Sequence, residues 1–143
     1  MVKVNTIGFK ELEAKLKNAP ANLRKEIGAE IQFAAERFTE LAVKDAPANV
    51  AGGIGLRGSI RPVKVAELTS EVAVHKEYAP YVEWGTITRV QVPSELASYA
   101  IQFKGRGIRK NGGMFPQPFF FKQIPIVRKE TIAHIENILQ DLV

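Results

Sequence analysis

Cysteine is absent from this chain, and histidine occurs twice among its 143 residues. The lack of thiols excludes disulfides and thiolate metal sites, which fits a reducing compartment such as the cytoplasm. No run of about 18 apolar residues is available to span a bilayer, and the first residues lack the apolar core of a secretory signal. We therefore expect a soluble protein with no membrane partner.

Charge of one sign is in modest excess only. The net charge is +5, and the hydrophobic and charged fractions of 45% and 24% are typical of one globular domain. Basic residues gather in one short stretch that also holds two glycines and no acid: Lys104, Arg106, Arg109 and Lys110. We expect a basic glycine loop here that becomes ordered only on an acidic partner.

Two long segments repeat apolar residues at the spacing of an amphipathic helix. The first predicts a helix over 21–44 that ends before Pro47, because the residue preceding a proline is disfavoured in the α conformation. Its apolar stripe consists of Leu23, Ile27, Ile31, Ala34, Phe38 and Leu41. The second predicts a terminal helix opened by Pro125, with a stripe at Ile132, Ile135, Leu139 and Leu142. Each stripe is expected to be buried.

Shorter patterns predict a small sheet and further elements. Alternating residues predict two strands, 60–65 and 71–74, joined around residues 68–70 as an antiparallel hairpin. An edge strand is expected over 2–7, a helix over 9–17, and a helix begun by Ser94 within an insertion at 87–115. The sequence thus predicts an α+β fold in one domain, 1–143, in which two long amphipathic helices pack on a small antiparallel sheet.

Three patterns that would carry chemistry elsewhere lack the context that the chemistry needs. Residues 53–58 match G-x-G-x-x-G, but a helix precedes them and a strand follows, the reverse of a dinucleotide site. His75 and His134 have no nearby set of zinc ligands. Ser59, His75 and Asp45 contain the residue types of a triad, but no nucleophile elbow surrounds Ser59. We expect no enzymatic activity, no cofactor and no metal.

A short aromatic helix is predicted from Tyr78 to Trp84, with Pro80 in its first turn and Gly85 as a left-handed stop. Tyr78, Tyr81 and Val82 are expected to share one side of this helix. We expect Trp84 and Tyr81 to be core residues that anchor it against the long N-terminal helix.

The carboxylate of Glu83 lies within this aromatic helix, and two interpretations of it remain open. Glutamate is rarely buried without a partner. Glu83 is therefore either solvated on the outer face, or paired with Arg57, Arg61 or a residue of a neighbouring subunit.

Three consecutive phenylalanines, Phe119, Phe120 and Phe121, follow Pro118. Consecutive side chains of a helix or strand cannot all face one core, so at least one ring is expected at the surface. Exposed aromatic rings are typical of protein interfaces. The alternative is a loop, bent with the help of the flanking prolines, that buries all three rings.

Five features follow one another along nearly the whole chain. They are a helix-rich N-terminal half ending in Ala46-Pro47, the segment Leu56-Arg57-Gly58-Ser59-Ile60, a strand pair, the segment Tyr78-Ala79-Pro80-Tyr81-Val82-Glu83-Trp84-Gly85-Thr86, and Pro118-Phe119 before a terminal helix. This order resembles the small neck and tail-completion proteins of long-tailed bacteriophages. The Tyr-Val-Glu-aromatic-Gly-Thr core is the most specific part of the resemblance.

The resemblance implies a structural virion protein without enzymatic activity, assembled in the host cytoplasm, that acts at the head–tail junction through ring-like assembly. Its implied partners are other copies of itself, neighbouring neck or tail proteins and, without sequence specificity, DNA in the channel. The candidate assembly residues are Arg57, Glu83, Phe119, Phe120 and Phe121, and the structural motif comprises Tyr78, Tyr81, Trp84, Gly85 and Thr86.

The main alternative is a nucleic-acid-binding module that uses the basic loop 104–110. Such a module would lose affinity steeply with salt, because each phosphate contact releases counterions. The sequence contains no helix-turn-helix, RNP or zinc motif to position that loop. A small hydrolase is a further alternative, and the absence of a credible acid–base pair disfavours it.

Overall fold

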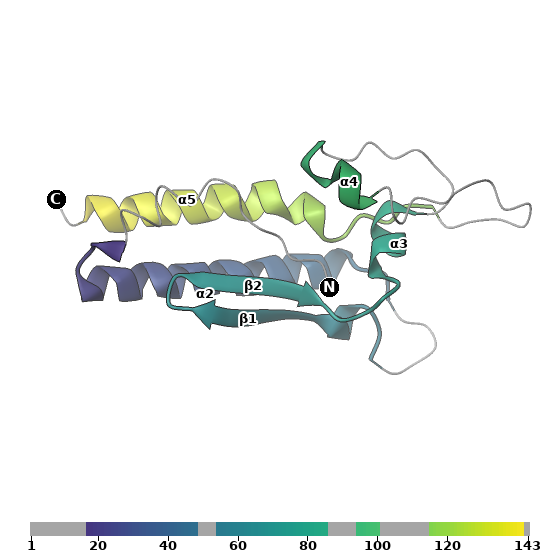
Figure 1. Cartoon of the computed structure of the whole chain (residues 1–143), viewed down its shortest axis with the longest axis horizontal. Coiled ribbons are helices and arrows are strands. Elements are labelled where there is room, and N and C mark those ends of the chain that lie inside the picture. Colours follow the sequence, from purple (N-terminus) through teal and green to yellow (C-terminus); the bar gives the residue numbers. More distant parts are fainter. Residues whose placement is uncertain (1–16, 49–53, 86–93, 101–114, 142–143) are drawn as a thin grey trace, which may run out of the picture.

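The computed structural model describes residues 17–48, 54–85, 94–100 and 115–141 (Figure 1). The α-helices and strands in these ranges are α2 (Ala21–Asp45), β1 (Ile60–Ala66), β2 (Thr69–Val74), α3 (Ala79–Trp84), α4 (Ala97–Ala100) and α5 (Ile124–Gln140). Short 3-10 turns occur at Arg57–Ser59, Ser94–Leu96 and Phe121–Gln123. The predicted α+β class, the two long helices and the antiparallel hairpin are confirmed.

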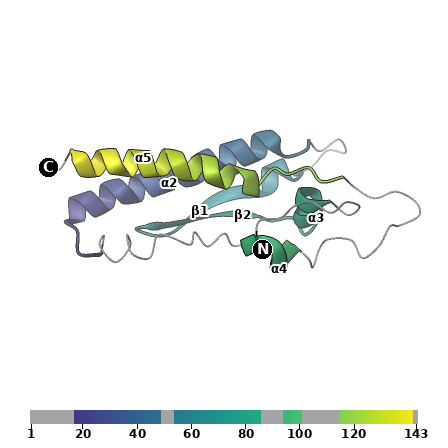
Figure 2. The same ribbon diagram turned by 90° about the horizontal axis from the view of Figure 1, so that it is seen from above.

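Helix α2 is the centre of the arrangement. It packs against α5 along one side and against β1 and β2 along another, as the two perpendicular views show (Figures 1 and 2). The hairpin thus rests mainly on α2, and α5 covers a different side of the same helix. Its predicted apolar stripe supplies this packing, with Leu23, Ile27 and Phe38 buried. The helix ends at Ala46, which is extended before Pro47 as the sequence predicts.

The hairpin pairs Ile60 with Val74 and Val63 with Glu71. Its turn is tighter than predicted, because Thr69 already belongs to β2 and a register shift follows Lys64. The turn approaches α2 at Gly28, where an added Cβ would lie 2.4 Å from the carbonyl oxygen of Glu67. Glycine at this position therefore lets the hairpin lie directly on the helix.

The core has two parts along the length of α2. The larger cluster gathers α2, the start of β1, the end of β2, α3 and the start of α5, and it includes Phe38, Val82, Phe119, Phe120 and Val127. The smaller cluster joins the other ends of the two long helices through Leu23, Ile27 and Ile135. The larger cluster surrounds the segment that carries the most specific sequence motif.

Several predictions from the sequence lie outside the described residues. They are the strand over 2–7, the helix over 9–17 apart from Lys17, Leu142, Thr86, most of the insertion at 87–115 and the whole basic loop 104–110. Within that insertion, the helix predicted to begin at Ser94 is present as the short pair Ser94–Leu96 and Ala97–Ala100.

Candidate functional site

Helix α3 is a six-residue element with two different faces. Pro80 lies in its first turn, as predicted, and Ala79, Pro80, Val82, Glu83 and Trp84 are buried. Tyr78 and Tyr81 are 46% and 40% exposed, so the prediction that Tyr81 is a core residue is wrong. A helix this short has too few positions for its spacing to define the buried face.

Gly85 ends α3 with φ 67° and ψ 177°. The positive φ agrees with the predicted glycine stop, but the extended ψ differs from the left-handed helical conformation that was expected. This region of backbone space is almost restricted to glycine, because a Cβ would clash there. The chain consequently leaves α3 in a direction that other residues adopt only with strain.

Glu83 is the central residue of the site, with 4% of its surface exposed. Its Oε2 atom accepts the backbone N–H groups of Phe119 at 2.8 Å and Phe120 at 3.0 Å, and its Oε1 atom accepts that of Phe121 at 3.1 Å. Both interpretations from the sequence are therefore corrected. The carboxylate is neither solvated nor paired with Arg57 or Arg61, and its partners are main-chain donors.

The three amides that contact Glu83 lie where the chain enters the 3-10 turn Phe121–Gln123 and then α5. The first N–H groups of a helical segment have no intrahelical acceptor, and the positive end of the helix dipole favours an anion there. Glu83 supplies both the acceptors and the negative charge from a distant part of the chain. It acts as a long-range N-terminal cap that fastens α3 to α5.

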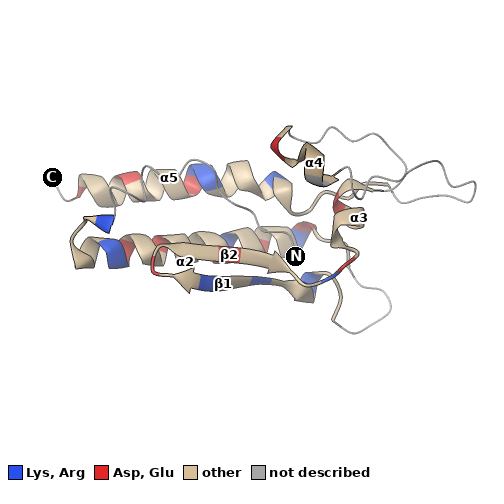
Figure 3. Ribbon diagram, viewed as in Figure 1, with Lys and Arg blue, Asp and Glu red and all other residues tan. Residues whose placement is uncertain are grey.

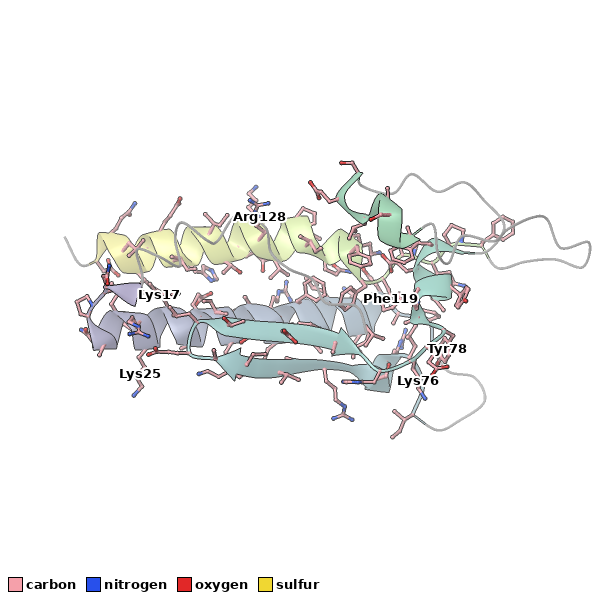
Figure 4. All side chains as sticks on the ribbon, in the orientation of Figure 1. Lys17, Lys25, Lys76, Tyr78, Phe119 and Arg128 are labelled. Carbon is pink, nitrogen blue, oxygen red and sulfur yellow. The ribbon has the colours of Figure 1, made fainter. Side chains whose placement is uncertain are left out.

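The phenylalanine run is bent around this carboxylate and is packed in the core. Phe119 and Phe120 are buried, and Phe121 is partly buried. Phe119 and Phe120 thus follow the alternative of a bent loop, whereas Phe121 is partly exposed, so the loop does not bury all three rings. Because three consecutive N–H groups converge on one carboxylate, the backbone is neither helix nor strand there and the alternation rule does not apply. Phe119 lies between α3 and the long helices in Figure 4.

Aromatic contacts fill the space around this bend. Phe120 meets Phe38 of α2 edge to face, with ring centres 4.9 Å apart. Trp84 stacks on Phe121 at 5.4 Å with an interplanar angle of 13°. Trp84 is a buried residue, as predicted, and its stacked partner belongs to the segment before α5. These contacts are of the kind that add stability beyond apolar burial.

A polar contact beside the aromatic rings joins the end of α2 to the start of α5. Gln123, which is buried, donates from Nε2 to Oδ2 of Asp45 at 2.7 Å and to the carbonyl oxygen of Phe119 at 3.1 Å. The ammonium group of Lys122 lies 2.9 Å from the same Asp45 oxygen. Hydrogen bonds from Lys122 and then Gln123 lower the pKa of Asp45 below its ordinary value. Sequence analysis missed Gln123, which has no distinguishing neighbours in the sequence.

Arg57 has a structural partner of its own. Its Nε atom donates to the carbonyl oxygen of Ala46 at 2.7 Å, which ties the turn before β1 to the end of α2. Arg57 therefore braces α2, and the pairing with Glu83 that the sequence left open does not occur.

The described residues do not assemble the chemical sites that the sequence raised and discounted. The hydroxyl of Ser59 donates to the carbonyl oxygen of Leu56, and Asp45 is engaged by Lys122 and Gln123. His134 pairs with Glu30, with 2.6 Å between Nδ1 and Oε1. No group of three or more His, Cys, Asp or Glu side chains in the described ranges could hold a metal ion.

The Glu83 site links two distant segments of the main chain. All the contacts described for the carboxylate are to main-chain donors, and the Phe119 to Phe121 rings that it positions are packed inside. The same site places polar aromatic residues on the outside, since Tyr78 and Tyr81 lie on the other face of α3. The N–H of Gln117 donates to the carbonyl oxygen of Val82 at 2.8 Å, which holds the strand-like segment after the exposed Phe115 against α3.

Comparisons with protein-family models, with curated proteins and with solved structures find no match for this chain. In the part of the chain that the structure describes, no helix is long and apolar enough to cross a membrane.

Proposed function

We propose that this chain is a structural virion protein of a long-tailed bacteriophage, a neck or tail-completion component that acts at the head–tail junction through ring-like assembly. The observation that carries the proposal is the Glu83 site. It joins the Tyr-Val-Glu-Trp-Gly segment to the Pro-Phe segment, the two late motifs of the resemblance, through hydrogen bonds across 36 residues. The fold therefore brings these two motifs into direct contact at one buried site.

Exposed apolar side chains give independent support for assembly. Large apolar or aromatic residues are exposed on α2, on β1, around α3 and on α5, and they include Phe33, Val63, Val65, Tyr78, Tyr81, Phe115, Ile126 and Ile132. Single exposed apolar residues are ordinary, and the support here comes from those that lie close together around α3, Tyr78 and Tyr81. Among the candidate assembly residues inferred from the sequence, Glu83, Phe119 and Phe120 are buried, Phe121 is partly buried, and Arg57 is exposed. The outer apolar residues are therefore added as candidate contacts.

The proposal is tested by a nonsense mutation in the reading frame of a phage that carries this chain. Infected cells should accumulate full heads and separate tails, and purified wild-type particles should contain the protein at the junction. Particles that are assembled normally without the protein would contradict the proposal.

The nucleic-acid-binding alternative is tested on the purified protein. Its basic loop, 104–110, lies outside the described residues. Serine replaces the four basic residues, Lys104, Arg106, Arg109 and Lys110, in one variant. Junction assembly and DNA binding are then measured separately for this variant. A protein whose main role is DNA binding would show affinity that falls steeply with salt in the parent and disappears in the variant.

A further inference from the structure

The exposed side of α2 presents an aromatic ring among charged side chains. Arg37, which lines the same surface as Phe33, is paired with Glu40 and Glu130, whereas Lys25 is exposed beside Glu26 and forms no ion pair in the described structure. Phe33 is 53% exposed, although its ring lies 6.5 Å from that of His134. Glu26 and Glu36 are seven residues before and three residues after Phe33, so all three lie on the same face of the helix. In the described structure Glu26 takes part in no ion pair, and Glu36 accepts only a hydrogen bond from Gln32. This face, Glu26–Phe33–Glu36, is called the α2 knob below.

The outer side of α5 presents a complementary surface. A shallow hollow of about 520 Å³ is lined by Ile124, Pro125, Arg128, Lys129, Ile132, Ala133 and Glu136. Ile132 was predicted to belong to the buried stripe, but it is 38% exposed and forms part of this hollow. Its position, three residues from the buried Ile135, places it at the border of the buried face. This surface is called the α5 hollow below.

Two basic side chains on the α5 hollow have no acidic partner in the described part of the chain. Arg128 and Lys129 are exposed and form no ion pair there, and only Glu136 among the lining residues is acidic. Arg128 points away from α2 (Figure 4), and Lys and Arg residues are visible along the α5 ribbon in Figure 3. The hollow therefore has Ile132 beside two unpaired bases and Glu136, whereas the knob has Phe33 beside two unpaired acids and the unpaired base Lys25.

We propose that the α2 knob of one copy docks in the α5 hollow of the next copy. This inference rests on the ring-like assembly proposed above and identifies its contact. An exposed ring with an excess of unpaired acids is complementary in charge to an apolar hollow with an excess of unpaired bases. The contact is heterologous, because one copy contributes α2 and the other contributes α5. Repetition of such a contact closes into a ring when the rotation between copies allows it.

The size of the surfaces explains why a ring would be favoured over a dimer. A standard stable interface covers roughly 800 Å² per partner, and a contact made by one helix face on each side is expected to be smaller. A dimer would use one such contact between two copies, whereas every copy in a closed ring makes two. The free protein is therefore expected to associate weakly at low concentration and cooperatively at high concentration.

The absence of cysteine from the chain makes a direct test possible. Phe33→Cys and Ile132→Cys are made as separate single variants, concentrated, and treated with a short bismaleimide alone and as an equal mixture. A heterologous contact predicts cross-linked dimers in the mixture and few in either variant alone. Thr69→Cys, at the exposed first residue of β2, replaces Phe33→Cys as the matched control and should give no cross-link with Ile132→Cys.

Each other outcome of this test overturns the proposal. Dimers of Phe33→Cys alone would indicate an isologous contact between two α2 helices. No dimer in the mixture at the highest soluble concentration would exclude the knob and hollow as partners. Cross-linking of Ile132→Cys in intact particles to a different protein, without Phe33→Cys cross-links, would identify another occupant of the hollow.

A charge exchange tests the electrostatic part of the inference. Glu26→Lys with Glu36→Lys, and Arg128→Glu with Lys129→Glu, should each reduce association at least tenfold at low salt. The chain that carries all four substitutions should recover it, because every contact is again between opposite charges. Failure to recover, with all proteins folded by circular dichroism, would overturn the contact.

Failure of the contact and failure of the virion role give different results. If the cross-link forms but the protein is absent from particles, the contact stands and the virion role is wrong. If the protein lies in a junction ring whose copies do not cross-link between positions 33 and 132, the virion role stands and the contact is wrong.

Discussion

Glu83 and Phe119 are 36 residues apart in the chain, and the Oε2 atom of Glu83 accepts the N–H of Phe119 at 2.8 Å. The neighbouring bonds from Phe120 and Phe121 repeat this link. Because the carboxylate is buried, loss of its donors or of its own oxygens leaves polar groups that water cannot readily solvate. Helix α3 and the start of α5 are thus held as one unit, with the exposed tyrosines on its outer surface.

The first prediction concerns this carboxylate. Glu83→Gln should lower the free energy of unfolding by about 2 kcal/mol, because one of the two oxygens becomes an NH2 group that faces backbone donors. Urea unfolding followed by circular dichroism measures the change. Glu77→Gln, on the exposed residue just before α3, is the matched control and should change stability by less than about 0.5 kcal/mol. Equal losses of stability in the two variants would show that the hydrogen bonds from the three amides do not require the charge of Glu83.

The second prediction separates the aromatic residues of α3. Trp84→Ala should destabilise the protein by about 3–5 kcal/mol, the range for loss of a large buried aromatic residue. Tyr81→Ala should cost much less, because Tyr81 is 40% exposed. Thermal unfolding of both variants checks the order. A Trp84→Ala protein that unfolds like the parent but fails to assemble would assign Trp84 to an interface instead.

The long helix α2 and the hairpin could be predicted from the sequence, because their apolar residues recur at a regular spacing. The stripe from Leu23 to Leu41 repeats over more than five turns, which is enough to fix a helix, its end and its buried face. The alternation in β1 and β2 similarly fixed a hairpin, although not its turn, because turn length depends on how closely Glu67 approaches Gly28. Such a contact is not encoded in the spacing of apolar residues.

The Glu83 site could not be predicted for a different reason. Its donors are backbone amides, which every residue except proline carries, so no residue type marks them in the sequence. The bend at Phe119 to Phe121 depends on a carboxylate 36 residues away, and the rule of alternating faces applies only to regular backbone. Phe33 lies off the apolar stripe of α2, and its exposure agrees with the helical spacing of that stripe.

The third prediction is a pH dependence at the junction of α2 and α5. Hydrogen bonds from Lys122 and Gln123 hold the pKa of Asp45 below its ordinary value of 3.8. A carboxyl group with a lowered folded-state pKa contributes stability that is present above the unfolded-state value and is lost as the pH falls through the folded-state value. The stability difference between the parent and Asp45→Asn should therefore be constant above about pH 5 and shrink below about pH 4.

Chemical unfolding of both proteins between pH 3 and 7 tests this dependence. Glu26→Gln, an exposed residue on α2 without an ion pair in the described structure, is the control for general effects of lost charge. A difference that stays constant down to pH 3 would show that Asp45 does not titrate in contact with Lys122 and Gln123.

The last prediction concerns Gly85, whose φ of 67° and ψ of 177° orient the chain as it leaves α3. Gly85→Ala should cost about 1–3 kcal/mol, because a Cβ is strained in this conformation whatever space surrounds it. Gly58→Ala is the control, since Gly58 lacks a positive φ and an added Cβ would meet only the side chain of the exposed Ile54. Its effect should be smaller.

A double-mutant cycle then asks whether Gly85 serves the Glu83 site. The N–H of Gly85 donates to the carbonyl oxygen of Tyr81 at 2.8 Å, so strain at Gly85 acts on the last turn of α3, which carries Glu83. If alanine at position 85 shifts that turn, part of the Glu83 hydrogen bonding is already lost, and Glu83→Gln should cost less in the Gly85→Ala background than in the parent. Additive effects would show that Gly85 ends the helix without positioning the carboxylate.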